Sequence, residues 1–336
     1  MPEMAFTGCV FFMSFLKEHR WRMKDTLKGK IIKGVGGFYY VNVEADESKE
    51  DIIYECRAKG IFRKNKEKPL PGDDVELKPL SEMLPDGYPE GSIIKILERK
   101  NSIIRPQVAN IDQAMVVFAC VYPEPNLNLL DRFLINMERQ SIPTVIVFNK
   151  NDLVGADKLK ELTDTYKNSG YKVLTINTIG DLTNSLESGI EETREILLKE
   201  LRGKTTVLAG PSGVGKSSVM KLLSPKAEVE TGTLSEKIGR GKNTTRHTEL
   251  FYLEKETYLL DTPGFSTIYI QGMQPEELRD YYNEFLEYSS KCKFNTCRHV
   301  SEPGCAVKRA VEEGNINRTR YENYLQLFSE LKSGKY

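Results

Sequence analysis

A glycine-rich segment carries the strongest chemical signal in this sequence of 336 residues. It matches the phosphate-loop pattern GxxxxGK[ST] and comprises Gly210, Pro211, Ser212, Gly213, Val214, Gly215, Lys216, Ser217 and the following Ser218. Its glycines let backbone N–H groups converge on phosphates, and the N-terminus of a following helix favours the same negative charge. We expect Lys216 to reach the β- and γ-phosphates and the Ser217 hydroxyl to ligate Mg²⁺. The segment therefore predicts a nucleoside triphosphate site.

A motif typical of a nucleotide switch comes later in the chain. Asp261-Thr262-Pro263-Gly264 directly follows an apolar run. An Asp in that position supports Mg²⁺ in phosphate-loop enzymes, and the N–H of Gly264 can contact the γ-phosphate. The Gly-rich segment 239–247 lies between the two motifs, and either Thr244 or Thr245 can close over Mg²⁺, with Thr245 taken as the metal ligand. A plain basic loop is the alternative interpretation of this segment.

A motif suited to reading a purine base precedes both of these. Asn149, Lys150, Asn151 and Asp152 form NKND at the end of an apolar run. A carboxylate at Asp152 can accept hydrogen bonds from N1–H and N2–H₂ of guanine together. Adenine has no such pair of donors and would leave the charge unpaired. NKxD also occurs by chance in surface helices, but after a strand in a phosphate-loop domain it favours GTP over ATP.

The order of the three motifs is unusual. Most GTPases have the phosphate loop first, the DxxG switch next and NKxD last, whereas here NKND begins at 149, the loop at 210 and the switch at 261. A permuted chain can form the same sheet when the original termini lie close together. Because the C-terminal region starts soon after the switch, we expect loss of the γ-phosphate to act directly on residues 276–336.

The C-terminal region contains a cluster of potential metal ligands. Cys292, Cys297, His299 and Cys305 lie within 14 residues, and three thiolates with one imidazole satisfy a tetrahedral structural Zn²⁺. The other cysteines, Cys9, Cys56 and Cys120, are interpreted as small buried hydrophobic residues. Basic residues surround the cluster and indicate either an RNA-facing surface or a solvated face: Lys291, Lys293, Arg298, Lys308 and Arg309.

The elements that must position these motifs change character along the chain. Residues 24–100 contain short strands separated by turns, at 27–33, 38–43, 52–58, 60–63, 75–77 and 91–97, which predict a small closed β-barrel of the OB type. Its basic loop is either a solvated hairpin or a phosphate-binding surface: Lys59, Arg63, Lys64, Lys66 and Lys68.

From about residue 103 strands and helices alternate, which predicts a mostly parallel sheet with helices on both faces. We expect strands at 114–121, 143–148, 172–176, 205–209 and 258–260, and helices at 127–140, 157–169, 186–201 and 216–223. The predicted fold is therefore multidomain. It has an N-terminal extension at 1–23 that is expected to be disordered, an OB-type barrel at 24–100, an α/β circularly permuted GTPase domain at 101–275 and a mostly helical zinc-binding domain at 276–336.

Composition is consistent with this interpretation. The formal net charge is zero, so contacts with nucleic acid would come from local patches. No run approaches the roughly 20 apolar residues of a membrane span, and the N-terminal apolar run lacks the features of a signal peptide. We expect a cytoplasmic monomer that makes no contact with membranes.

Together these features resemble the circularly permuted GTPases that act on the small ribosomal subunit of bacteria. The resemblance extends over nearly all of residues 24–336 and depends on Arg105-Pro106, Asn110-Ile111-Asp112-Gln113, NKND, the phosphate loop, residues 240–247, DTPGF and the cysteine cluster. It implies an RNA-binding barrel, a GTPase and a zinc domain. It also implies a late role in 30S maturation, with rRNA as a partner and with GTP hydrolysis stimulated by the subunit.

The sequence departs from the family pattern at three places. Asn243 replaces the usual His of the first switch, Asn177-Thr178 replaces Ser-Ala near the base, and Phe265 follows the second switch where many GTPases have a catalytic Gln. Slow intrinsic turnover is therefore expected, with a partner completing the site. A GTP-gated RNA or protein clamp with incidental hydrolysis is the alternative function. NKND argues against an ATP-dependent kinase, and the spacing of the cluster argues against a DNA-binding zinc finger.

Overall fold

The computed structural model describes residues 26–44, 51–60, 62, 68–83, 88–103, 107–178, 186–224, 248–262 and 264–334. Several sequence predictions lie outside these residues: the N-terminal extension, Cys9, Arg63, Lys64, Lys66, Arg105-Pro106, Pro263, and the first switch with Asn243, Thr244 and Thr245. The chain divides into two compact units, residues 1–98 and 99–336, and each is described here by itself.

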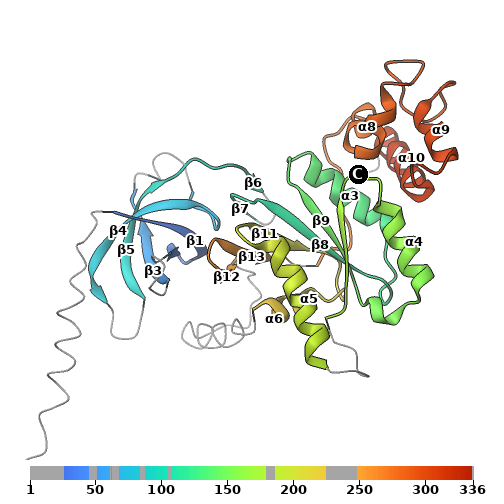
Figure 1. The fold of residues 1–336 in the computed structure, drawn as a ribbon. Helices are drawn as coiled ribbons and strands as arrows, with labels where there is room; N and C mark the ends of the chain where they lie inside the picture. Colours follow the sequence, from blue (N-terminus) through green and yellow to red (C-terminus); the bar gives the residue numbers. More distant parts are fainter. Residues whose placement is uncertain are drawn as a thin grey trace, which may run out of the picture. The chain divides into compact units, whose positions relative to one another are not determined.

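The first unit is a closed five-stranded barrel (Figure 1). Its strands are β1 (Leu27–Val35), β2 (Phe38–Val43), β3 (Ile52–Ala58), β4 (Asp74–Met83) and β5 (Pro89–Ile96). They follow the order β1-β2-β3-β5-β4, with β4 antiparallel to β1 and β3 parallel to β5. This confirms the predicted N-terminal barrel and its OB type.

Alternating apolar residues fill the barrel, because successive side chains of a strand point to opposite faces. Ile31, Val41 and Leu77 have no exposed surface. The strand predicted at 60–63 is wrong in its described positions, since Gly60 and Phe62 are helical. The N–H of Phe62 donates to the Lys59 carbonyl at 3.1 Å, and this turn lets the Phe62 ring join the barrel core.

The second unit is built on a six-stranded sheet (Figure 1). Its strands are β8 (Gln113–Ala119), β9 (Thr144–Asn149), β10 (Lys172–Ile176), β11 (Thr205–Ala209), β12 (Leu250–Glu254) and β13 (Thr257–Asp261). In the order β10-β9-β8-β11-β13-β12, all neighbours are parallel except β12, which pairs antiparallel at the edge. β12 was not predicted, although residues 250–253 form a short apolar run; only Leu250 of this edge strand is fully buried. A short pair, β6 (Ser102–Ile103) and β7 (Val108–Ala109), precedes the sheet.

Helices cover both faces of this sheet, as predicted. One face packs against α5 (Leu186–Leu201) and α6 (Lys216–Leu223) in a core that includes Val117, Val147 and Leu208. The other face carries α3 (Leu127–Glu138) and α4 (Ala156–Tyr166), where the Phe148 and Tyr166 rings contact each other. Because β8, β9 and β11 are buried on both faces, their sequences are continuous apolar runs.

The C-terminal helices continue the same unit (Figure 1). They comprise η2 (Pro275–Tyr281), α8 (Asn283–Ser289), α9 (Ala306–Glu312) and α10 (Arg318–Ser333). Their common core includes Phe285, Tyr324 and Leu327, and Ile135 of α3 belongs to it. The helical character predicted for this region is confirmed. Within the described ranges, no helix has the length and apolar character needed to cross a bilayer.

Candidate functional site

The phosphate loop lies between β11 and α6 and needs glycine at two close approaches. Gly210 has φ +147°, and a Cβ there would lie 2.2 Å from the Val117 carbonyl oxygen of the neighbouring strand. Gly215 has φ +100°, and a Cβ there would lie 2.2 Å from Nδ2 of Asn149. The loop is therefore packed directly on β8 and on the base-reading motif, with no room for a side chain at either position.

Lys216 begins α6 and folds back over this loop. Its Nζ donates hydrogen bonds of 2.8 Å to the carbonyls of Gly210 and Pro211. Burial lowers the pKa of Lys216, and Asp261 opposes that effect. Burial likewise raises the pKa of Asp261, and Lys216 opposes it. The buried cation Lys216 and the exposed carboxylate Asp261 thus line one cavity of about 620 Å³. Its other lining residues are Ser212, Gly213, Gly215, Ser217, Glu249, Phe251, Thr262 and Gly264.

The DTPG motif ends β13 beside the phosphate loop. The N–H and the hydroxyl of Thr262 both donate to the Leu208 carbonyl, at 3.1 and 2.9 Å, and tie this strand end to β11. A Cβ added to Gly264 would lie 2.9 Å from the Ser212 nitrogen and 3.1 Å from Nζ of Lys216. Gly264 therefore lies directly over the loop, as a γ-phosphate sensor requires.

The NKND motif divides into two parts. Asn149 is fully buried, and its Nδ2 donates to the Val214 carbonyl at 2.9 Å and to Thr178 Oγ1 at 3.4 Å. Nζ of Lys150 donates to the Gly213 carbonyl at 2.9 Å and also to the Tyr122 carbonyl. Both side chains therefore brace the phosphate loop. By contrast, Asp152 lies exposed in the turn η1 (Asn151–Leu153), where its carboxylate is accessible to a base.

The three motifs meet at one edge of the sheet because each follows the carboxyl end of a parallel strand. β9 precedes NKND, β11 precedes the phosphate loop, and β13 leads into DTPG. Ser217 lies in the first turn of α6 and lines the cavity, so its hydroxyl fits a Mg²⁺ ligand. Of the two candidate magnesium contacts, Ser217 is thus placed at the cavity, whereas Thr245 lies outside the described residues.

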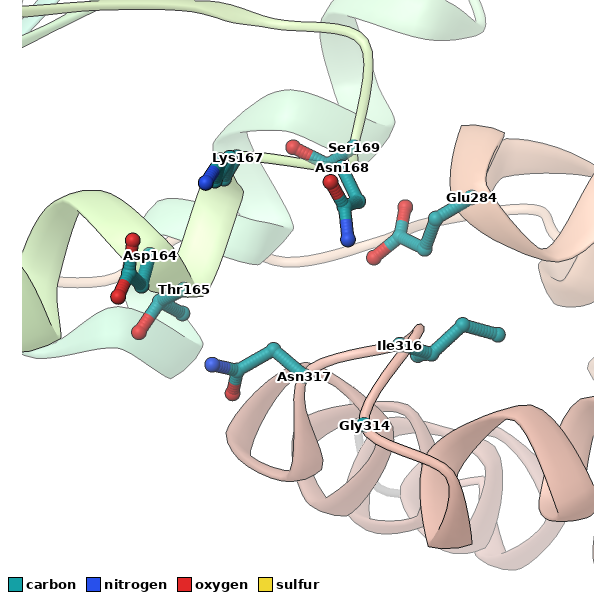
Figure 2. Close-up of a pocket in the computed structure, with 9 residues that line it drawn as sticks. All are labelled: Asp164, Thr165, Lys167, Asn168, Ser169, Glu284, Gly314, Ile316 and Asn317. Carbon is teal, nitrogen blue, oxygen red and sulfur yellow. The ribbon is translucent and has the colours of Figure 1, made fainter.

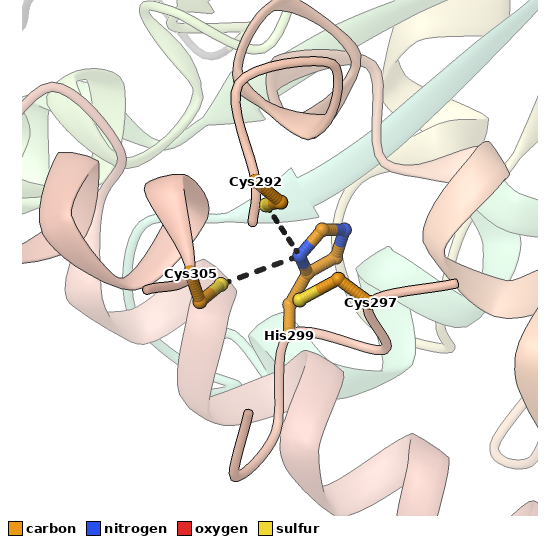
Figure 3. Close-up of side chains that lie close together, drawn as sticks. All are labelled: Cys292, Cys297, His299 and Cys305. Carbon is orange, nitrogen blue, oxygen red and sulfur yellow. Dashed lines mark hydrogen bonds between the residues drawn. The ribbon is translucent and has the colours of Figure 1, made fainter. Parts of the chain in front are cut away.

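The predicted metal ligands converge (Figure 3). Donor atoms of Cys292, Cys297, His299 and Cys305 all lie within 4.8 Å of one another. Nδ1 of His299 lies 3.6 Å from Sγ of Cys292 and 3.4 Å from Sγ of Cys305. Tetrahedral zinc with bonds of about 2.3 Å to sulfur and about 2.0 Å to nitrogen separates its ligand atoms by roughly 3.5 Å. The donor set and its spacing therefore fit a tetrahedral zinc ion.

Groups around the cluster orient its ligands. Nε2 of His299 lies 3.2 Å from the Ser289 hydroxyl, which leaves Nδ1 for the metal. The backbone N–H groups of Ala306 and Lys308 donate to Sγ of Cys292 and Cys305 at 3.3 and 3.4 Å. Burial raises the pKa of the Cys305 thiol to about 12, and burial lowers that of His299 to about 4. A bound cation would supply the charge that buried thiolates need.

A second cavity, of about 270 Å³, lies between α4 and the C-terminal helices (Figure 2). Its wall combines Asp164 and Thr165 of α4 with Glu284 of α8 and Asn317, the N-cap of α10. No residue of the NKND, phosphate-loop or DTPG motifs lines this cavity. Glu284 is ion-paired with Arg320, and its carboxylate is therefore already satisfied.

Sequence reasoning missed a buried ionic network beside this cavity. Arg320 of α10 pairs with Glu284 at 2.7 Å and with Asp131 of α3, and all three side chains are at most 7% exposed. The Tyr166 hydroxyl donates to Asp131 at 2.9 Å. Charged residues in amphipathic helices usually face solvent, so their sequence positions gave no signal of burial. Removing one partner would leave an uncompensated buried charge.

Comparison with known proteins supports the family that the sequence resembles. A family model described as the RsgA N-terminal domain matches residues 28–85, and one described as the RsgA GTPase matches residues 96–271. A small ribosomal subunit biogenesis GTPase RsgA of Agathobacter rectalis is 48% identical over 312 residues, covering 91% of this chain and 99% of that protein. The protein of that name from Alkaliphilus metalliredigens is 46% identical over 309 residues, covering 92% and 99%.

Two solved structures are also similar over nearly their whole length. YloQ, described as a circularly permuted GTPase, has a TM-score of 0.72 at 36% identity and covers 95% of this chain and 99% of that one. YjeQ from Thermotoga maritima has a TM-score of 0.69 at 35% identity and covers 91% and 99%. With a matching family model over more than half of the sequence and the nucleotide motifs gathered at one sheet edge, the chain belongs to the RsgA GTPase family.

Proposed function

We propose that this GTPase acts in late maturation of the small ribosomal subunit, where it binds rRNA and is stimulated by the subunit. The observation that supports this proposal most directly is that NKND, the phosphate loop and DTPG converge at the edge of the sheet where the cavity lies. The names of the curated relatives, small ribosomal subunit biogenesis GTPases, supply the partner. We propose that the protein performs this role as a monomer in the cytoplasm.

In this proposal the site residues divide the chemistry of GTP hydrolysis. Lys216 and the N–H groups of the phosphate loop bind the β- and γ-phosphates, and Gly264 senses the γ-phosphate. Bound Mg²⁺ would neutralise charge on the phosphates, with Ser217 as its ligand from the loop and Asp261 supporting its water shell. The carboxylate of Asp152 reads guanine. Phe265 has no group that can orient water, so intrinsic turnover is slow.

We expect Asp152→Asn to exchange the base preference. The amide of Asn offers one acceptor and one donor, which match the N1–H and the C2 carbonyl of xanthine but oppose the amino group of guanine. Affinity for GTP should fall by about 100-fold and affinity for XTP should rise correspondingly. Equilibrium titration with fluorescent GTP and XTP measures both.

Asp157→Asn is the matched control, because Asp157 is also exposed and lies five residues away in the first turn of α4. It should leave both affinities within about twofold of the wild type. An Asp152→Asn protein that still prefers GTP to XTP by the original ratio would show that another group reads the base.

Surfaces suited to RNA support the proposed partner. Because Tyr39 and Val43 pack against the barrel core, the alternate residues Phe38 and Tyr40 of β2 face outward. The Arg57 guanidinium lies 4.7 Å from the centre of the Phe38 ring. Stacked aromatic and basic groups on an OB barrel suit single-stranded RNA.

We also propose one structural zinc ion in the Cys292, Cys297, His299 and Cys305 cluster. This ion would hold the exposed neighbours Lys291, Lys293 and Arg298 in place.

Purified ribosomal subunits test this function. Release of phosphate from GTP should rise by at least about tenfold with the small subunit and should not change with the large one. Lys216→Ala, added to the same reactions, measures hydrolysis by contaminating enzymes. Equal stimulation by both subunits, or none by either, would contradict the proposal.

The stacked Phe265 favours one alternative, a GTP-gated clamp in which hydrolysis is incidental. A clamp would bind the small subunit with a nonhydrolysable GTP analogue and release it with GDP, yet would show no stimulated turnover. Sedimentation of the protein with subunits in each nucleotide, run beside the turnover assay, distinguishes the two functions.

A further inference from the structure

The ring of Phe265 stacks on the ring of Phe133 in α3. The ring centres lie 5.6 Å apart and the planes are inclined by 11°. Phe133 is 7% exposed and Phe265 is half-buried. Offset-stacked aromatic rings attract each other beyond the burial of their area, and their preferred geometry limits how far either ring can shift. Phe265 is therefore held by α3.

This stack bears directly on the phosphate site. Phe265 immediately follows Gly264, and Gly264 lies over Ser212 and Lys216. On the side of the phosphate loop, the N–H of Phe265 donates to the Gly210 carbonyl across 3.4 Å, a long hydrogen bond. The better-defined contact of Phe265 is thus the aromatic one.

The opposite side of α3 is attached to the C-terminal helices. Asp131 pairs with Arg320 of α10, and residues two apart on a helix point in nearly opposite directions, so Asp131 and Phe133 lie on different sides. The end of α3 contacts the segment after the switch, where Nη1 of Arg139 donates to the Gln271 carbonyl at 2.8 Å. α3 therefore connects Gly264 to the helices that surround the metal cluster.

We propose that Phe133 is a positioning residue for GTP hydrolysis: through its stack with Phe265 it holds Gly264 at the γ-phosphate and ties that position to α10. Phe133 touches no substrate and acts only through Phe265. The inference rests on the phosphate-site part of the proposed function and does not depend on the ribosomal partner. Among the described residues, no side chain other than Phe133 forms a ring contact with Phe265.

Phe133→Leu tests the proposal, because Leu keeps α3 apolar and removes the ring. We expect kcat for intrinsic GTP hydrolysis to fall about tenfold, since small displacements in a phosphate site are costly. Affinity for the imido analogue of GTP should fall about fivefold, while affinity for GDP, which has no γ-phosphate, stays within about twofold. Phe265→Leu should have the same effect. Phe265→Tyr keeps a ring at this half-buried position and should retain the wild-type kcat and nucleotide affinities.

Phe328→Leu is the matched control. Phe328 is 6% exposed, lies in the same unit and packs in the C-terminal core, a cluster to which Phe265 does not belong. It should lower thermal stability much as Phe133→Leu does, with no change in the ratio of the two nucleotide affinities. An unchanged ratio and kcat in Phe133→Leu and Phe265→Leu, or an equal change in Phe328→Leu, would overturn the proposal. If Phe133→Leu does not fold, Phe265→Leu alone decides the test. Failure of the wild type to bind GDP would contradict the phosphate site itself.

Discussion

GTP hydrolysis by Lys216→Ala is expected to fall by about 1,000-fold relative to the wild type. Lys216 is 9% exposed, and its ammonium lies against the Gly210 and Pro211 carbonyls, within the loop where the phosphates bind. Removing it takes away the one described lysine that lines the cavity. Among the described residues of the cavity, N–H groups alone would then oppose the negative charge that develops during phosphoryl transfer, together with any bound Mg²⁺. Phosphate release under single-turnover conditions measures the loss.

Two further variants make this result specific. Lys216→Met keeps most of the side-chain volume and should be as inactive as Lys216→Ala, which separates loss of charge from loss of packing. Lys221→Ala removes an exposed lysine from the same helix, and its turnover should stay within about twofold of the wild type. Activity of Lys216→Met above about a tenth of the wild-type value would show that the charge of Lys216 is not essential.

Removal of the proposed zinc ion is expected to unfold the C-terminal helices. Cys297 and Cys305 belong to the same core as Phe285 and Tyr324, so the metal site and the helix packing are formed together. Structural zinc sites contribute on the order of 10 kcal/mol of binding free energy near neutral pH, and this energy stabilises the fold. Metal analysis should find one zinc ion per chain. Chelation should then abolish the cooperative unfolding of this region, as followed by circular dichroism.

Cys305→Ala should contain no stoichiometric zinc, whereas Cys120→Ala, which removes an equally buried cysteine from the same unit, should retain it. Binding must also weaken as pH falls, because the metal displaces protons from thiols whose pKa is raised by burial. A Cys305→Ala protein with a full complement of zinc would place the ion elsewhere.

Many elements of the fold were predictable because their residues carry local signals. The strand at 205–209, the helix at 186–201 and the helix at 216–223 begin and end in the structure where the sequence predicted them. Buried parallel strands appear as continuous apolar runs, and glycines mark the phosphate loop. The edge strand β12, in spite of its short apolar run at 250–253, and the turn at Phe62 were not predicted. The first is only partly buried, and the second is shaped by the barrel core that it closes.

The positions of side chains relative to distant elements were harder to predict from the sequence. NKND appeared to be one base-reading unit, yet Asn149 and Lys150 hold the phosphate loop and Asp152 alone is exposed. Phe265 was notable only as the residue that replaces Gln, and its ring turned out to stack on Phe133, 132 residues earlier in the chain. Such pairs form because the sheet brings the segments together, and no local pattern encodes them.

The sequence by itself predicted the nucleotide-binding motifs, their permuted order and the candidate metal ligands. Each of these depends on residue types at short spacing: a phosphate loop, a carboxylate after a strand, and three cysteines with a histidine. The tertiary structure alone decided how these parts are connected. α3 carries Asp131 on one side and Phe133 on the other, so it joins α10 to the switch. That arrangement depends on helix packing between residues far apart in the chain, which local spacing cannot specify.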